Sequence, residues 1–462
     1  MNTLHKLLLA VSVMGLACAT GCATEIVEEE ETASGALKDY GTGSKLFSTT
    51  NPLYKAGLDG YEVLFTNPIC APQKNPPGVV SVSGKPITQK PENVYCTYDD
   101  AGVSGARADA PQKRLTEWIR DPATKEIFFT YLSFSNSTIA KELCEAVKTR
   151  GVNLTFILDA KTDTAKASEL AACTGPGGIK PRFEKRGHVS GIGYAHNKLF
   201  VINPKGEHPR IVFSSGNMSS GIVLHHENWN FVTVPKNTHF AQAHLCLIEG
   251  TLDHATSGKE YRAFIDSCRK AIPVKEESDI RTFFVPGDGD RATKFLVDGV
   301  NQATQIDLAA HRFSMTALKQ AVANRLKGSK RPLARLIVDD DMYWAMKDQQ
   351  VGDNLPWEAS NVTYLESLGL KPRYMETNHD SHLLHHNKYA VLTMGNFGVP
   401  SAVFTGAGNF TNDAFEKNLE NFYYITMPDV VEKFKKQYEY VYTDLATSPD
   451  MMPTKNVSPV DQ

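Results

Sequence analysis

The sequence predicts an α/β fold in which two similar halves, each with a mixed β-sheet, face one shared cleft. The first observation is a His-Asn-Lys tripeptide that occurs twice, as His196-Asn197-Lys198 and as His386-Asn387-Lys388. The second is that the residues around both copies repeat as well, about 190 positions apart. The third is that strand-like and helix-like segments alternate in both halves.

The repeat extends on both sides of the tripeptides. Gly-Ile-Lys-Pro-Arg-Phe at 178–183 is matched by Gly-Leu-Lys-Pro-Arg-Tyr at 369–374. Downstream, a turn of small residues ends at Asn217 in one copy and at Asn409 in the other. A Glu-Asn-aromatic triplet then begins at Glu227 and again at Glu420. The same residue types in the same order indicate an internal duplication.

The first half opens with a βαβ unit. After a helix that ends near residue 119, the aromatic and β-branched stretch 126–134 predicts a strand. Ser137 or Thr138 is expected to cap a helix that runs to 148 and ends at Gly151. Residues 152–158 predict a second buried strand, which closes at Asp159. This order is typical of a mostly parallel sheet.

The remaining elements follow the same plan. Strands are expected at 198–202, 211–213 and 231–234, and helices at 238–249 and 259–270. The second half repeats helix 292–302, strand 305–310, helix 316–326 and strand 334–338, which ends at Asp339. Strands at 389–392, 401–404 and 422–425 precede an amphipathic helix at 429–442. The two His-x-Lys copies therefore lie at strand ends, where open α/β sheets bind ligands.

A division of the chain follows from these patterns. The expected parts are a signal peptide at 1–21, an acidic tether at 22–37, an irregular segment at 38–110, the first half at 111–250, a connector at 251–290, the second half at 291–446 and a disordered tail at 447–462.

Composition excludes a strongly basic nucleic-acid binder. The chain has 462 residues and a formal net charge of -3. One lysine and five glutamates fall within residues 1–31, so the rest of the chain is close to neutral. A local basic groove stays possible, but the overall charge does not demand a polyanionic partner.

The N-terminus predicts export. Lys6 precedes an apolar run at 7–17 and a small-residue cleavage site that ends at Cys22. Small residues before a cysteine resemble a bacterial lipoprotein signal, with Cys22 as the lipid-bearing residue that anchors the protein to an outer membrane or the cell surface. The alternative is plain secretion or a periplasmic location.

The six cysteines that follow Cys22 predict disulfides, because an even number in an exported chain favours pairing. Pairing between neighbours is the simplest of the fifteen possible connectivities, and it joins Cys70–Cys96, Cys144–Cys173 and Cys246–Cys268.

The repeated residues have the chemistry that phosphodiester cleavage needs. Residues i and i+2 of a strand point to one face, so His196 projects with Lys198 and His386 with Lys388. One imidazole can attack phosphorus while the other protonates the leaving oxygen. The lysines and the amides of Asn217 and Asn409 can hold the other phosphate oxygens, and Glu227 and Glu420 can orient the imidazoles.

With these residues in view, the chain resembles the phospholipase D superfamily over roughly residues 114–445. That family carries two His-x-Lys copies, each followed by a small-residue turn that ends in Asn. The resemblance implies duplicated α-β-α-β-α halves, one active site at their pseudo-twofold interface, a phosphohistidine intermediate and no cofactor or metal. It also implies His196 as the nucleophile and His386 as the general acid.

The chain departs from the family pattern at two kinds of position. The family usually has Asp five residues after the Lys, where this chain has Asn203 and Thr393. The Gly-Ser before the Asn is replaced by Ser214-Ser215 in one copy and Gly406-Ala407 in the other. These departures affect the assignment to a subclass of the family more than the type of reaction that the resemblance implies.

Two clusters could suggest a metal. The histidines at 379, 382, 385 and 386 and the run His225-His226-Glu227 are interpreted as residues that line the cleft rather than as zinc ligands. Asp339-Asp340-Asp341 is interpreted as a loop in water at the end of a strand.

The preferred function is hydrolysis of phospholipids, for which export and a near-neutral body are suitable. A secreted or periplasmic endonuclease is the alternative, and it would need a basic groove. A non-catalytic binding protein of the same fold is a third reading, because of the missing Asp positions. A phosphatidyl transferase such as cardiolipin synthase is disfavoured because no transmembrane helices flank the halves. The expected partner is the phosphodiester substrate, and no protein partner is implied.

Overall fold

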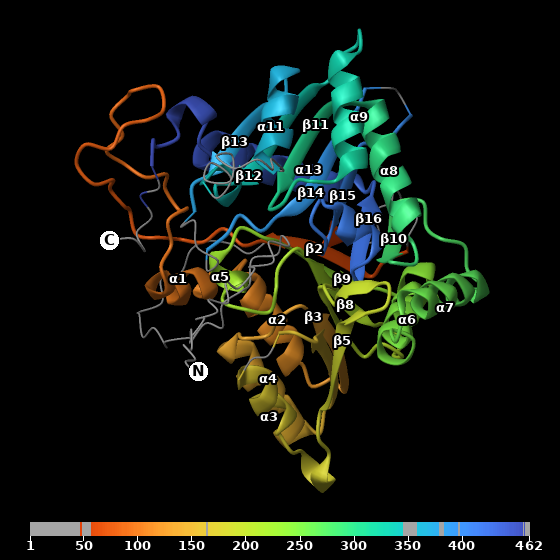
Figure 1. The fold of residues 1–462 in the computed structure, drawn as a ribbon. Helices are drawn as coiled ribbons and strands as arrows, with labels where there is room; N and C mark the ends of the chain where they lie inside the picture. Colours follow the sequence, from red (N-terminus) through yellow and green to blue (C-terminus); the bar gives the residue numbers. More distant parts are fainter. Residues whose placement is uncertain are drawn as a thin grey trace, which may run out of the picture.

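The computed structural model describes residues 47–48, 57–162, 165–344, 358–377, 383–395, 398–455 and 457. The predicted signal peptide, tether and Cys22 lie outside these residues. Within them the chain forms two mixed β-sheets flanked by helices, as the α/β prediction required (Figure 1). None of the described helices combines the length and the apolar character that crossing a bilayer demands.

The first sheet has the strand order β1-β2-β9-β8-β7-β3-β4-β5-β6. Its strands β3, β4 and β5 are parallel, and the other pairs are antiparallel. The strands are β1 Phe47–Ser48, β2 Gly60–Phe65, β3 Glu126–Tyr131, β4 Asn153–Asp159, β5 Arg182–Val189, β6 Ile192–Tyr194, β7 Leu199–Ile202, β8 Arg210–Ser214 and β9 Asn228–Thr233.

The second sheet has the order β10-β16-β15-β14-β11-β12-β13, and here β11, β12 and β13 are parallel. The strands are β10 Ile280–Val285, β11 Ala303–Ala310, β12 Leu333–Asp339, β13 Lys371–Met375, β14 Lys388–Met394, β15 Ala402–Gly406 and β16 Glu420–Ile425. Each of its strands has a counterpart at the same position in the first sheet, from β2 opposite β10 to β5 opposite β13. The repeat seen in the sequence therefore corresponds to a repeat of the strand order in the two sheets.

The repeat begins one strand earlier than the sequence indicated. β2 lies in the segment expected to be irregular, yet it pairs with β9 along its whole length. β10 lies in the expected connector, yet it pairs with β16 over all six residues. Both strands are buried on both faces, so neither shows the alternation that identifies a half-exposed strand.

Helices cover the outer faces of the two sheets (Figure 1). In Figure 1, α2, α3 and α4 lie on the first sheet, and α8, α9 and α11 lie on the second. The helices are α1 Ala101–Ala106, α2 Pro111–Arg120, α3 Ser137–Arg150, α4 Ala165–Ala171, α5 Gly221–Leu224, α6 His239–Asp253, α7 Gly258–Ala271, α8 Gly289–Gln302, α9 Thr316–Lys327, α11 Glu358–Ser367, α12 Asn412–Glu416 and α13 Pro428–Tyr440.

A common core joins the halves. One apolar cluster takes residues from both sheets and from α6, α7 and α13, whereas two further clusters lie under the outer helices. At its centre Phe213 of β8 stacks on Tyr423 of β16, with ring centroids 3.7 Å apart. The two sheets therefore pack as parts of one body.

Three local predictions were wrong. The N-cap of α3 is Asn136, whose side chain accepts from the Ile139 amide, and not Ser137 or Thr138. The tail expected to be disordered is ordered over 447–455, because Met452 is fully buried and Thr447 pairs with Tyr374. The Asp339-Asp340-Asp341 loop is buried rather than in water. Asp339 Oδ1 accepts from the Asp341 amide, and Asp341 forms an ion pair with Arg312.

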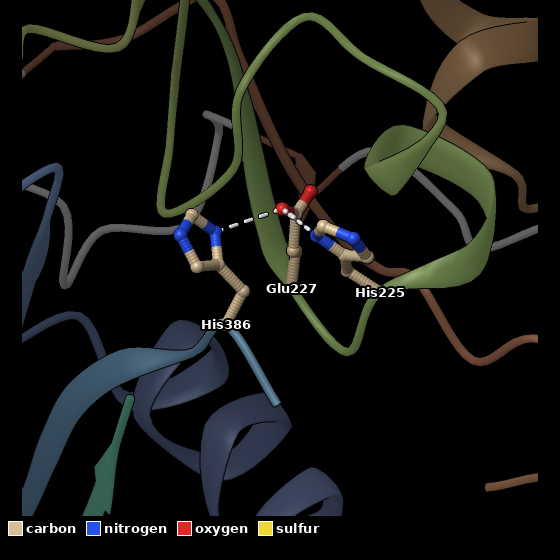
Figure 2. Close-up of side chains that lie close together, drawn as sticks. All are labelled: His225, Glu227 and His386. Carbon is tan, nitrogen blue, oxygen red and sulfur yellow. Dashed lines mark hydrogen bonds and ion pairs between the residues drawn. The ribbon is translucent and has the colours of Figure 1, made fainter. Parts of the chain in front are cut away.

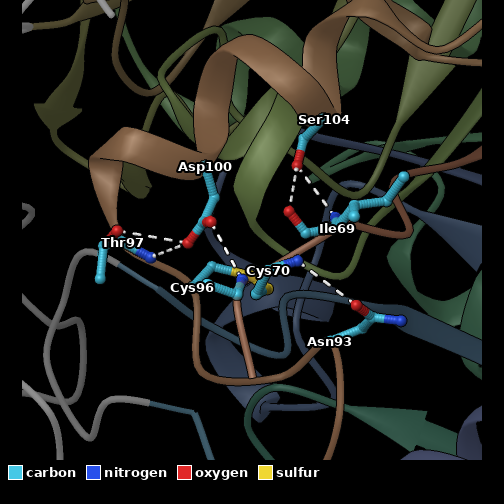
Figure 3. The surroundings of a disulfide bond; sticks show 8 residues. Ile69, Cys70, Asn93, Cys96, Thr97, Asp100 and Ser104 are labelled. Carbon is cyan, nitrogen blue, oxygen red and sulfur yellow. Dashed lines mark hydrogen bonds between the residues drawn. A yellow bond between two sulfur atoms is a disulfide. The ribbon is translucent and has the colours of Figure 1, made fainter. Parts of the chain in front are cut away.

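All three predicted disulfides are present, and they indicate an oxidising compartment. The Cys70–Cys96 bond closes the loop that follows β2 (Figure 3). Hydrogen bonds fix its surroundings: Asn93 Oδ1 accepts from the Cys70 amide, and Asp100 accepts from the amides of Ala71 and Thr97. The disulfide therefore closes a loop that hydrogen bonds also hold in place.

Removal of this bond should cost about 3 kcal/mol of unfolding free energy, because it frees a loop of 26 residues in the unfolded chain. We expect this loss in the double variant Cys70→Ser, Cys96→Ser, measured by denaturant titration. The Cys246→Ser, Cys268→Ser variant opens a loop of 22 residues and serves as a comparison of similar expected size. An unchanged midpoint in the first variant would contradict the prediction.

Candidate active site

The two His-x-Lys copies lie at matching places in the two sheets. His196, Asn197 and Lys198 directly precede β7, and Lys388 is the first residue of β14, which holds the same position in the second sheet. His196 and Lys198 thus stand at the entrance to a strand rather than within it. As whole residues, the two histidines and the two lysines of the copies are each 5% exposed or less.

Main-chain hydrogen bonds join each copy to the opposite half. The His196 amide donates to the Leu419 carbonyl at 3.0 Å, and the Leu419 amide donates to Tyr194. In the same way the His386 amide donates to the His226 carbonyl at 3.0 Å. Each histidine is therefore carried next to the glutamate of the other half.

The histidines and glutamates form two crossed pairs. His196 Nδ1 lies 2.9 Å from Glu420 Oε2, and His386 Nδ1 lies 3.0 Å from Glu227 Oε1. Figure 2 shows the second pair, with His386 from the second half pointing at Glu227 from the first. Both glutamates are fully buried. A carboxylate accepts from Nδ1–H, so each ring is left with Nε2 for chemistry.

The two lysines make different contacts. Lys198 Nζ lies 3.0 Å from His196 Nε2. Lys388 Nζ donates to the carbonyls of Ser215, at 3.0 Å, and of His386, at 2.8 Å. An ammonium has no lone pair, so His196 Nε2 must accept from it. With Glu420 at Nδ1, this contact favours the tautomer of His196 that has the proton on Nδ1 and a lone pair on Nε2.

Burial and positive charge favour the neutral form of both rings. The pKa of His196 falls well below its ordinary value because of burial, then Lys198 and Lys388. Burial, then Lys388 and His311, lowers the pKa of His386 in the same direction. Each histidine is affected by both lysines, so the two copies share one electrostatic site. Burial raises the pKa of Glu420, and Lys198 opposes this.

Two aspartates at the ends of matching strands hold the histidine segments. Asp159 Oδ2 accepts from the Ala195 amide at 2.8 Å, one residue before His196. Asp339 Oδ2 accepts from the His385 amide, one residue before His386. The sequence offered a signal for this role, since both strands close at Asp, but only the fold shows the contact.

The remaining predicted residues lie around the pairs. Asn217 is buried in the turn after β8, and Asn409 is half-buried in the turn after β15. The Ser215 carbonyl in the first turn accepts from Lys388, which ties that turn to the site. The proposed contacts of both amides with substrate stay predictions.

The positions where the family has Asp are remote from the histidines. Asn203 lies at the other end of β7 from His196, with a left-handed backbone at φ 50°. Its side chain accepts from the amides of Lys125 and Glu126 and donates to the Ala123 carbonyl. Thr393 lies near the far end of β14. Asn203 thus has a structural role at the start of β3.

Two histidines near His386 were not predicted as site residues. His311 follows β11, and its ring lies 4.9 Å from that of His386. His225 precedes Glu227 by two residues, and its Nδ1 lies 3.5 Å from Glu227 Oε1 (Figure 2). A signal for His225 existed in the run His225-His226-Glu227, which the sequence analysis interpreted as lining the cleft without giving His225 a role in the site.

A metal ligand set exists among the described residues. One ligand atom from each of His225, Glu227 and His386 lies within 4.8 Å of the others. Imidazole and carboxylate are ligands that zinc accepts. The contacts of Glu227 with both rings have an equally direct explanation as hydrogen-bonded and ionic pairs. His379 and His382 lie outside the described residues.

No family model matches the chain, and no curated protein matches it in sequence. In structure it is similar to phosphatidylserine synthase from Haemophilus influenzae, with a TM-score of 0.53 and 15% identity over 73% of this chain and 85% of that one. This similarity shows that the two proteins have a common fold, and it agrees with the predicted duplicated α/β halves.

Two further structures give lower scores. The phospholipase D family member Nuc from Salmonella typhimurium has a TM-score of 0.28 and 20% identity over 37% of this chain and 96% of its own. The yeast tyrosyl-DNA phosphodiesterase has a TM-score of 0.40 and 11% identity over 68% of this chain and 85% of its own.

Gly216 should be essential to the His386–Glu227 pair. A Cβ at position 216 would lie 1.8 Å from Glu227 Oε2, so Gly216→Ala must displace the carboxylate. We expect the hydrogen-bonded Nδ1–H signal of His386 to disappear from the proton NMR spectrum. The matched control is Gly328→Ala, where the nearest atom to a new Cβ is 3.4 Å away. An unchanged His386 signal in a folded Gly216→Ala protein would contradict this geometry.

Proposed function

We propose that this chain, which has the fold of the phospholipase D superfamily, is a phosphodiesterase that hydrolyses phospholipids through a phosphohistidine on His196. The observation that carries the proposal is the state of His196. Glu420 accepts from its Nδ1 and Lys198 donates to its Nε2, so the lone pair of Nε2 is ready for attack on phosphorus.

The first step forms one bond and breaks one. His196 Nε2 attacks phosphorus, and the bond from phosphorus to the leaving oxygen breaks. His386, in its cationic form with a proton on both ring nitrogens, gives its Nε2 proton to that oxygen as general acid and becomes neutral. Lys198 then gives up its hydrogen bond to His196 Nε2 and donates to a phosphate oxygen instead. There it and Lys388 stabilise the negative charge of the phosphate oxygens. Glu420 remains at Nδ1 and holds the ring of the phosphohistidine in place.

The second step reverses the roles. His386, now neutral, takes a proton from water as its oxygen attacks phosphorus. The bond between phosphorus and His196 Nε2 breaks, and the ring returns to its starting state. Glu227 holds His386 in one orientation throughout, because it accepts from Nδ1.

Phospholipid is the preferred substrate on three grounds. The chain outside residues 1–31 is close to neutral, the three disulfides fit an exported protein, and the sequence predicts a lipid-bearing Cys22. The structurally similar phosphatidylserine synthase has a name that refers to a phospholipid, which supports this class. A nuclease is the alternative, and it would show a steep dependence on salt.

The deciding experiment measures head-group release from mixed phospholipid vesicles beside nicking of plasmid DNA, both in EDTA. We expect wild-type protein to release head group, and His196→Ala and His386→Ala to lose about 10³-fold or more of this activity. His208→Ala, which changes an exposed histidine, is the control. DNA nicking alone would favour the nuclease, and full activity in either active-site variant would overturn the two-histidine mechanism.

The intermediate itself can be trapped. With a p-nitrophenyl phosphodiester the first step needs little acid, so His386→Ala should form the phosphohistidine but hydrolyse it slowly. Mass spectrometry of the quenched protein should then find the adduct on the peptide that contains His196. If no adduct is found in either the wild-type protein or the variant, the result would support a non-catalytic binding protein.

The pH profile should have its optimum on the acid side of 6.5. The reaction needs His196 neutral and His386 protonated, and burial with the lysines lowers both pKa values below 6.5. Activity is therefore lost as the pH rises through the pKa of His386, and also as it falls through that of His196. The measurement is kcat/KM against pH, which reports the free enzyme. An optimum well above neutral pH would contradict this prediction.

A further inference from the structure

We propose that His225, Glu227 and His386 form a binding site for a zinc ion, and that the bound ion inhibits the protein reversibly. The site takes two ligands from the first half of the chain and one from the second. The inhibition rests on the proposed function and deepens it, whereas the binding of zinc does not depend on that function.

The spacing of the three ligand atoms suits a single ion. With bonds of about 2.0–2.1 Å and tetrahedral angles, the ligand atoms around zinc lie about 3.3 Å apart. His386 Nδ1 lies 3.0 Å from Glu227 Oε1, and His225 Nδ1 lies 3.5 Å from the same oxygen. All three ligand atoms lie within 4.8 Å of one another, and the two rings approach the carboxylate from different sides (Figure 2). An ion between them therefore needs only small movements of the three side chains.

The ligands are held in place by the groups behind them. Trp229 Nε1 donates to Glu227 Oε2 at 3.1 Å, which leaves Oε1 for the two rings. A Cβ at Gly216 would lie 1.8 Å from Glu227 Oε2, so this glycine leaves space for the carboxylate. Gly221 does the same for the His225 ring, because a Cβ there would lie 2.5 Å from Nδ1. Outer contacts of this kind orient the ligands in metal sites.

The equivalent place in the other half offers fewer ligands among the described residues. The residue two positions before Glu420 is Asn418, whose amide nitrogen donates to Glu420 Oε1 at 3.2 Å. The Asn418 Oδ1 accepts from the Tyr194 amide, so both ends of this side chain are engaged. His196 and Glu420 are then one imidazole and one carboxylate, whereas zinc sites in proteins usually have three or four protein ligands. His225 is therefore the residue that makes one of the two places a metal site.

Two imidazoles and one carboxylate also select the kind of ion. Imidazole suits zinc and similar transition metals, whereas calcium and magnesium prefer sites made of oxygen atoms. Lys388 is close enough to His386 for its charge to act on that ring, and a positive charge opposes a dication at the same place. Zinc should therefore bind as a reversible inhibitor rather than as a permanent structural ion.

Zinc on Nδ1 removes His386 from both proposed steps. A neutral imidazole that binds zinc through Nδ1 has its one proton on Nε2. In the first step this ring has no second proton, so transfer of a proton to the leaving oxygen would leave an anionic ring. In the second step the protonated Nε2 has no lone pair that could take a proton from water. The zinc-bound protein should therefore behave as His386→Ala does.

The first test measures binding with the metal alone. Zinc chloride is titrated by calorimetry into chelator-treated, dialysed protein, and we expect one ion per chain. His225→Asn, which copies Asn418, should weaken binding about 100-fold or more because it removes a ligand. Trp229→Phe, which copies Phe422, should weaken it about tenfold because it removes only the outer hydrogen bond. His208→Ala changes an exposed histidine and should bind zinc as the wild type does.

Two results of this titration would overturn the site. One is a wild-type protein that binds no zinc. The other is zinc binding of equal affinity in the wild type and in folded His225→Asn or Trp229→Phe, which would place the ion elsewhere on the chain.

The second test measures inhibition, and each protein is compared with itself in EDTA. With the p-nitrophenyl phosphodiester, we expect wild type in zinc to release one p-nitrophenol per chain and then stop, because His196 still attacks but His386 cannot activate water. Turnover should fall about tenfold or more over the zinc concentrations at which the ion binds, and EDTA should restore it. Calcium and magnesium at the same concentrations should have no effect.

The outcomes separate this inference from the proposed function. Zinc that binds without inhibition, or that inhibits His225→Asn as strongly as the wild type, would overturn the inference. A wild-type protein that cleaves no phosphodiester in EDTA would overturn the proposed function, and the calorimetric test would still decide whether the zinc site exists.

Discussion

The hydrogen bond between each imidazole and a carboxylate of the opposite half is the interaction on which this molecule depends. Glu227 and Glu420 are fully buried, and so are Lys198 and Lys388. Buried charges are tolerated only when they are paired, and removal of one partner typically costs 3–5 kcal/mol. Either half alone would expose a glutamate that lacks its histidine, so the fold requires both halves to be present and closely packed.

The rest of the fold keeps each histidine next to the glutamate of the opposite half. β7 and β14 place the histidines, β9 and β16 place the glutamates, and main-chain bonds join one segment to the other. Asparagines next to the glutamates repeat the crossing: Asn421 accepts from the Lys198 amide at 2.9 Å, and Asn228 donates to Asn387 at 3.2 Å. Because the halves are held at both ends of each pair, a small shift between the sheets would disturb both pairs together.

Sequence patterns predicted the duplication and the disulfides, and they singled out the histidines, lysines and glutamates that the fold brings together, because each leaves a repeated or countable mark in the chain. They did not place β2 in the first sheet and did not predict β10 in the second, since strands buried on both faces lack alternation. The burial of the Asp339 loop was also out of reach, because three adjacent acids are normally solvated. That each glutamate serves the histidine of the other half follows only from the packing of the halves.

A symmetric frame that performs an asymmetric reaction must differ somewhere, and the differences lie in side chains. The main-chain contacts of the two copies match, from Asp159 and Asp339 to the amides of His196 and His386. What differs is that Lys198 contacts an imidazole while Lys388 contacts carbonyls, and that His225 stands where the other half has Asn418. Duplication therefore supplies two equivalent rings, and a few side chains around them give the rings different surroundings, which the proposed roles of nucleophile and acid require.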